Sequence, residues 1–144
     1  MDSKGKGDMM LRRIAWVIFL LMVSVSLADA QQPKIQITSP HDKAQVPERP
    51  LVEGTIAVPL AKVWVVARPV DGSAYWVQPR ATVSVTDLTW NAKIYIWRPG
   101  SLYVGKQFEI MAVANPRGPV KEGDVLSGWP EAQWKSEVIK VTRK

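Results

Sequence analysis

The stretch VWVVARPVDGSAYWVQP (residues 63–79) indicates the fold more directly than any other part of the chain. In residues 63–68 both alternating sets of side chains are largely apolar, and valine and tryptophan favour pleated strands. Asp71 and Gly72 form a pair that tolerates positive φ, and the aromatic run at residues 75–78 follows it. The stretch therefore predicts a hairpin with a tight turn at Gly72. Its first strand is apolar on both faces, so the face that points away from the core must be covered either by another part of the chain or by a partner.

Composition restricts the class of protein. The chain has 144 residues, which favours a single domain, and a formal net charge of +6. It contains no cysteine, so it has neither a disulfide framework nor a thiolate metal site. The positive charge is mild, and by itself it gives no reason to expect a nucleic-acid partner. The seven Trp and 11 Pro residues suit a small β domain with frequent turns.

Residues 1–30 have the pattern of a secretory signal. Basic residues precede an apolar run at residues 14–27, and Ala28-Asp29-Ala30 fits the small-residue cleavage pattern. We expect a signal-peptide helix, cleavage after Ala30, and a mature domain over residues 31–144. An exported chain without cysteine is typical of bacterial envelope or secreted proteins, so we expect a periplasmic or extracellular location. The alternative is an uncleaved segment that anchors the protein through residues 14–27, and only then do we expect membrane contact.

The mature chain shows about seven short strands separated by turn residues, and no helix. This pattern predicts an all-β sandwich of antiparallel strands. Between the strands lie a proline-rich loop at residues 39–50 and a long connection at residues 116–133. Gly54, inside the second strand, is expected to mark a close approach of another part of the chain. The expected strands cover residues 34–38, 51–57, 63–68, 75–78, 88–97, 107–115 and 134–143, and residues 82–85 are a candidate for a further short strand.

Several of these strand and turn patterns carry a resemblance to a known family. ITSP at residues 37–40, VEGTI at residues 52–56, and then VWVVARP, YWVQP and FEIMAV resemble the bacterial immunoglobulin-like domains of exported and surface proteins. The resemblance spans most of the mature chain, although the cysteine pair of antibody domains is absent. It implies an immunoglobulin-like sandwich in an exported setting. It implies no reaction, because function belongs to sites rather than to folds.

Candidate catalytic and metal-binding residues are sparse. His41 is the one histidine; it lies in a proline-flanked loop, and no nucleophile is placed beside it. The carboxylates are scattered and match no ligand signature, and no glycine-rich phosphate-binding motif is present. We therefore expect a protein that is not an enzyme and that uses neither a metal nor another cofactor.

Strand parity predicts an apolar patch on the outer face of one sheet. In an immunoglobulin-like sandwich, strands C, F and G are neighbours, so side chains of equal parity lie together. If Val63 and Val65 face the core, the outward set is Trp64, Val66, Met111, Val113 and Val138. Monomeric soluble proteins seldom leave a large apolar patch uncovered. Either the connection at residues 116–133 folds over this patch, or a protein partner binds there.

Aromatic residues indicate a second kind of site. Arg49 and Arg98 each precede a proline, and three aromatic residues, Trp76, Tyr95 and Trp97, are candidates for stacking on sugar rings. The alternative is that these rings fill the core. The sequence thus favours an exported, non-catalytic binding or structural module of the cell envelope with a protein partner. The second possibility is a carbohydrate-binding module that recognises an envelope polysaccharide.

Overall fold

The computed structural model describes residues 33–144, so the signal-peptide helix and cleavage site expected in residues 1–30 lie outside the described residues. Within the described part the chain forms eleven strands in two sheets, one short 3₁₀ turn (η1, Ser101–Tyr103) and no α-helix. No helix of this part is long and apolar enough to cross a membrane. The expected all-β architecture is therefore confirmed.

The smaller sheet has four antiparallel strands in the order β1-β3-β7-β6. Their bounds are β1 (Ile35–Ser39), β3 (Leu51–Ile56), β7 (Thr89–Lys93) and β6 (Thr82–Ser84). In β3 exposed and buried residues alternate strictly, as expected for a sheet with one face in water. Val52 and Ile56 point into the core from this strand.

The larger sheet has seven strands, and β8 lies at its centre. The order is β2-β11-β8-β4-β5-β9, and β10 pairs with the half of β8 that β11 leaves free. All its pairs are antiparallel except β2 with β11, which is parallel. The bounds are β2 (Gln45–Val46), β4 (Val63–Pro69), β5 (Tyr75–Val77), β8 (Gln107–Pro116), β9 (Val125–Leu126), β10 (Ala132–Lys135) and β11 (Ile139–Arg143).

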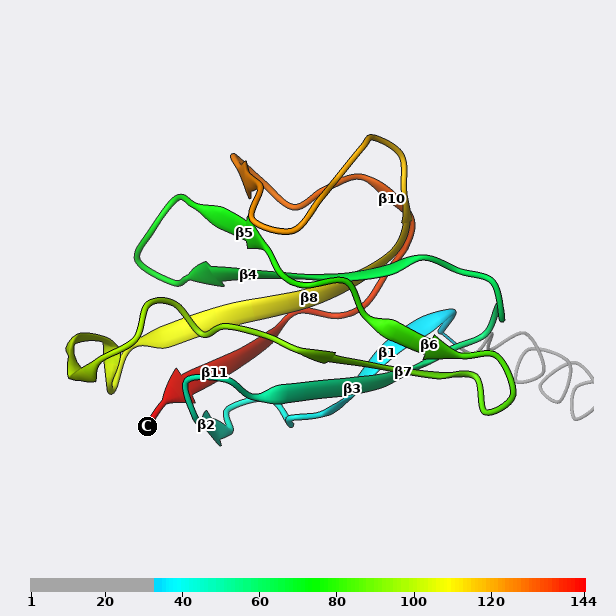
Figure 1. Ribbon diagram of the computed structural model, residues 1–144. Helices are drawn as coiled ribbons and strands as arrows, with labels where there is room; N and C mark the ends of the chain where they lie inside the picture. Colours follow the sequence, from blue (N-terminus) through cyan, green and yellow to red (C-terminus); the bar gives the residue numbers. More distant parts are fainter. Residues whose placement is uncertain (1–32) are drawn as a thin grey trace, which may run out of the picture. The chain divides into compact units, whose positions relative to one another are not determined.

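The two sheets pack face to face around one core (Figure 1). Trp90 of β7 lies in this core together with Val65 of β4 and Phe108 of β8, and each is at most 1% exposed. Burying one such side chain contributes roughly 1.5–3 kcal/mol, so the facing rows of apolar residues are the main source of stability. The inward parity expected for Val63 and Val65 agrees with this packing.

Gly54 lies where β1, β3 and β7 come closest. A Cβ atom at this position would overlap the backbone carbonyl oxygen of Gln36 and the ring of Trp90. The Trp90 ring is fixed there because its Nε1 donates a hydrogen bond to the Thr55 carbonyl, at 3.1 Å. The close approach expected from the sequence is therefore present, and only glycine fits it.

The structure corrects the expected strands in four places. The strand expected at residues 88–97 ends at Lys93 as β7 (Thr89–Lys93). The loop expected at residues 39–50 contains β2, and the connection at residues 116–133 contains β9. The strand expected at residues 134–143 is divided into β10 and β11 by Ser136, whose side chain enters the ladder. The Ser136 Oγ accepts a hydrogen bond from the Ala112 amide at 2.9 Å, and the Ser136 amide donates to the Ala112 carbonyl at 2.8 Å. The number of strands is thus eleven rather than about seven.

The hairpin of β4 and β5 exists, but its turn differs from the expectation. Residues 70–74 connect the strands, and Gly72 does not adopt positive φ, so the predicted tight turn is wrong. The Gly72 amide instead donates to the Pro69 carbonyl at 3.1 Å, because a five-residue loop can close with ordinary dihedral angles. Glycine is suited here by space, since a Cβ would lie 2.6 Å from the Pro69 Cγ.

Candidate functional site

The expected outer patch is present on the face of the larger sheet that points away from the core. Met111 and Val113 form a cluster there with Ala132, and the partly buried side chains of Trp64 and Trp129 pack against it. Strand register explains the grouping, because Trp64 of β4 lies opposite Val113 of β8. Val66, opposite Met111 on the same strand pair, is completely buried.

The connection between β8 and β10 covers this patch. The Trp129 ring contacts the Tyr75 ring edge-on, with centroids 4.8 Å apart. Backbone hydrogen bonds from the Val77 amide to Asp124 (2.8 Å) and from the Gly123 amide to Val77 (2.9 Å) fasten the connection to β5. Figure 1 shows this orange segment alongside β4 and β5. Of the two alternatives for the patch, the structure therefore shows cover by the chain itself.

Val138 is not part of the buried cluster. It lies in the short link between β10 and β11 and is 39% exposed. Because the expected strand is divided at Ser136, β11 begins only at Ile139, and Val138 lies just before the paired segment. Ala132 of β10 is a member of the cluster that the sequence did not predict.

Replacing Trp129 with alanine should reduce the free energy of unfolding by about 2–3 kcal/mol, somewhat less than a fully buried tryptophan costs. The loss arises because the ring covers Met111 and Val113, which would then contact water. Urea denaturation measures the effect. Val125→Ala is the control in the same connection: Val125 is 68% exposed, so this variant should change stability by less than about 0.5 kcal/mol. Equal stabilities of the two variants would show that the connection does not seal the patch.

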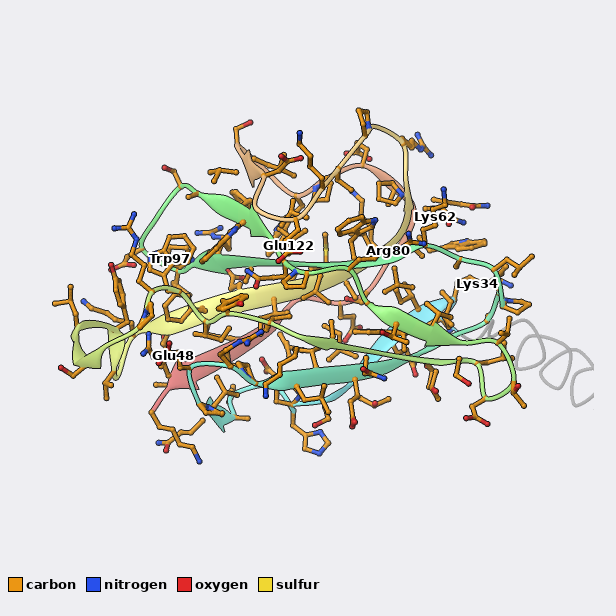
Figure 2. All side chains as sticks on the ribbon, in the orientation of Figure 1. Lys34, Glu48, Lys62, Arg80, Trp97 and Glu122 are labelled. Atoms are coloured by element: carbon orange, nitrogen blue, oxygen red, sulfur yellow. The ribbon has the colours of Figure 1, made fainter. Side chains whose placement is uncertain are left out.

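Three partly exposed rings form a second feature, which we call the aromatic row: Tyr95, Trp76 and Trp97. Tyr95 and Trp76 stack with centroids 6.2 Å apart and planes inclined by 19°, and Trp76 meets Trp97 edge-on at 5.4 Å. Trp97 then adjoins Phe108 of the core at 6.0 Å. Figure 2 shows Trp97 near the end of the sandwich at which β8 begins. The structure thus brings together all three candidates for stacking.

A buried glutamine holds one side of the aromatic row. Gln78 is fully buried, and its Oε1 accepts a hydrogen bond from the Tyr95 amide at 2.8 Å. The backbone N–H of Gln78 donates to the Val65 carbonyl at 2.9 Å, so the pairing with β4 continues one residue beyond the end of β5. Gln78 therefore ties the segment that carries Tyr95 to the strand that carries Trp76.

A buried arginine holds the other side. Arg143 is 3% exposed, and its guanidinium donates to the carbonyls of Ile96 (3.2 Å), Arg98 and Gly100 (2.8 Å). It also pairs with the Glu48 carboxylate at 3.4 Å. Between these carbonyls Trp97 has φ of 69°, in the left-handed region, which is strained for a bulky side chain by about 1–3 kcal/mol. Arg143 thus fixes an unusual backbone that sets the direction of the Trp97 ring.

The sequence reasoning identified neither Gln78 nor Arg143. The buried polar side chains of residues 33–144 are Gln78, Ser136 and Arg143, and two of these three hold the backbone at residues 95–100. A signal for Arg143 was present, because it has the same parity as the buried Ile139 and Val141. A charged residue on the inward face of a strand requires buried partners, and here those partners are main-chain carbonyls.

The remaining candidates of the sequence lie apart from both features. His41 is exposed, and no group of three or more metal-ligating side chains occurs within residues 33–144. Arg68 lies over the Tyr75 ring at 5.0 Å and pairs with Glu109 at 3.5 Å, so it belongs to the outer face.

Neither the protein-family models nor the curated proteins contain a match to this chain.

Proposed function

We propose that this chain is an exported, non-catalytic binding module whose ligand is a saccharide bound on the aromatic row. The fold we propose is an immunoglobulin-like sandwich. Its support is the strand order: β1 joins the smaller sheet while β2, next in the chain, joins the larger sheet beside β11. The β4, β8 and β11 neighbourhood corresponds to strands C, F and G of such domains.

The observation that carries the proposal is the support beneath the aromatic row. Tyr95, Trp76 and Trp97 are each partly exposed, and the accessible parts of aromatic rings suit contact with the carbon–hydrogen groups of a sugar. The buried Gln78 and Arg143 fix the backbone that presents Tyr95 and Trp97. A surface that is rigid before binding loses little conformational entropy on binding, which favours affinity.

The proposed surface differs from the outer patch. Met111 and Val113 are at most 4% exposed, because Trp129 and the β8–β10 connection lie over them. A protein partner would have to displace a connection that is hydrogen-bonded to β5. The aromatic row requires no such rearrangement, so it is the better supported of the two surfaces.

Tyr95→Ala should weaken saccharide binding about tenfold, because it removes one of the three rings of the aromatic row. The measurement is tryptophan fluorescence or calorimetric titration of the purified protein with a panel of oligosaccharides. Tyr75→Ala is a matched control, because Tyr75 is also partly exposed and also lies beneath an arginine, but on the outer face. It should leave binding unchanged. Absence of binding to every oligosaccharide, or equal losses in both variants, would contradict the proposal.

A further inference from the structure

We infer that the saccharide bound by the aromatic row is acidic and that Arg49 binds its carboxylate. The inference rests on the proposed function and adds the chemical class of the ligand. Its starting point is the position of Arg49, whose guanidinium carbon lies 4.0 Å from the centroid of the Tyr95 ring. At that distance the guanidinium lies against the ring and is attracted by its π electrons.

Stacking occupies the face of a guanidinium and leaves its in-plane N–H groups available. These groups form a planar fork that matches a carboxylate in bidentate geometry. Within residues 33–144 no side-chain hydrogen bond or ion pair involves Arg49, and the residue is exposed. The adjacent carboxylate, Glu48, pairs with Arg143 instead. The N–H groups of Arg49 thus lie beside the aromatic row and have no side-chain hydrogen bond or ion pair within residues 33–144.

A second arginine–tyrosine pair in the same domain shows the contrast. Arg68 also lies over a tyrosine, Tyr75, at 5.0 Å. Its fork, however, pairs with Glu109 and donates to the Tyr75 hydroxyl at 3.0 Å and to the Val70 carbonyl at 3.0 Å. Both guanidinium groups therefore lie over a tyrosine ring, but only that of Arg68 has hydrogen-bond and ion-pair partners in the described part of the chain. This difference separates a structural arginine from one that is available to a ligand.

The other end of the row also carries a positive charge. Arg98 follows Trp97 directly, and it is exposed. Its carbonyl accepts a hydrogen bond from the buried Arg143, while its own side chain forms no hydrogen bond within the described part of the chain. A ligand along Tyr95, Trp76 and Trp97 would therefore run between two cations. This arrangement favours a saccharide with repeated negative groups, and among such groups the planar carboxylate fits the fork best.

The test compares two ligands that differ only at their carboxyl groups: oligogalacturonate and the same oligomer with its carboxylates methyl-esterified. At about 0.15 M ionic strength, where long-range effects are screened, the free acid should bind about tenfold more tightly than the ester. Arg49→Gln should remove this preference, and Arg49→Lys should restore only part of it, because an ammonium has no planar fork. Arg80→Gln is the control: it removes an equal charge from an exposed arginine outside the row.

Dextran sulfate serves as a third ligand and distinguishes carboxylate from sulfate. If dextran sulfate alone binds, and Arg49→Gln weakens it, the carboxylate assignment is overturned in favour of a sulfated ligand. Equal affinities for the free acid and the ester, both reduced by Tyr95→Ala, would overturn the acidic class and leave the proposed saccharide function intact. Equal losses in Arg49→Gln and Arg80→Gln would overturn the inference, because the attraction would then be general. Absence of binding to all three ligands would overturn the acidic class, and absence of binding to every neutral oligosaccharide of the panel as well would overturn the saccharide function.

Discussion

Arg143→Leu is expected to reduce the free energy of unfolding by about 3–5 kcal/mol, the range for breaking a buried charged network from one side. The substitution removes every donor from the carbonyls of Ile96, Arg98 and Gly100 and leaves the Glu48 carboxylate without its partner. Arg143 binds the carbonyls on both sides of Trp97, so its loss should also displace the Trp97 ring and weaken saccharide binding. Urea denaturation measures the stability, and titration measures the binding.

Two further variants sharpen this result. Arg143→Lys keeps the charge, but one ammonium cannot reach all the carbonyls served by a guanidinium, so an intermediate loss is expected. Lys140→Gln, on the exposed side of the same strand, should change stability by less than about 0.5 kcal/mol. If Arg143→Leu cost less than about 1 kcal/mol, the backbone at residues 96–100 would be held by something other than Arg143.

Gly54→Ala is expected to cost at least about 3 kcal/mol, at the upper end of the effects of overpacking. The added methyl group would overlap the Gln36 carbonyl and the Trp90 ring, and neither can yield locally. The carbonyl belongs to β1, which is paired with β3, and the fully buried ring is hydrogen-bonded to Thr55. Relief of the overlap therefore requires β1 to separate from β3 or Trp90 to leave the core.

Gly118→Ala is the matched control for this substitution. No heavy atom lies within 4 Å of its added Cβ, and its φ is not positive, so stability should change by less than about 0.5 kcal/mol. The comparison separates the steric overlap at Gly54 from the effect that any replacement of glycine by alanine has on the conformational entropy of the unfolded chain. Similar midpoints of unfolding for the two variants would disprove the close approach at Gly54.

The sequence predicted correctly those parts of the fold for which a residue pattern is compatible with only one arrangement of the chain. The alternation of apolar residues set which face of β3, β4 and β8 is buried, because a slip of one residue would reverse every side chain. Gly54 was recognisable because glycine inside a strand has few other reasons to occur. The strand count was wrong because β2 and β9 have two residues each, too few for an alternation to be visible.

The candidate site was predictable in its rings but not in its supports. Trp76, Tyr95 and Trp97 were identifiable as residues for stacking, whereas their mutual geometry depends on contacts between segments far apart in the chain. Arg143 lies 47 residues from Ile96, its first carbonyl partner, and no local pattern connects them. The sequence left open whether the chain itself or a partner covers the outer patch, which Trp129 covers in the structure. Strand parity predicts which side chains share a face, but it does not predict which group packs over that face.

The parallel pairing of β2 with β11 has a mechanical consequence. Figure 2 shows Lys34 at one end of the domain, and Figure 1 marks the C-terminus at the other. Three hydrogen bonds from amides to carbonyls join the segment around β2 to the segment around β11. They run from Lys43 to Lys140 (2.6 Å), from Thr142 to Ala44 (2.9 Å) and from Lys144 to Val46 (3.0 Å). A force that pulls these ends apart acts along both strands, so it loads the bonds together in shear instead of opening them one after another. The domain should therefore resist extension between these two ends until the bonds of the β2–β11 pair break together.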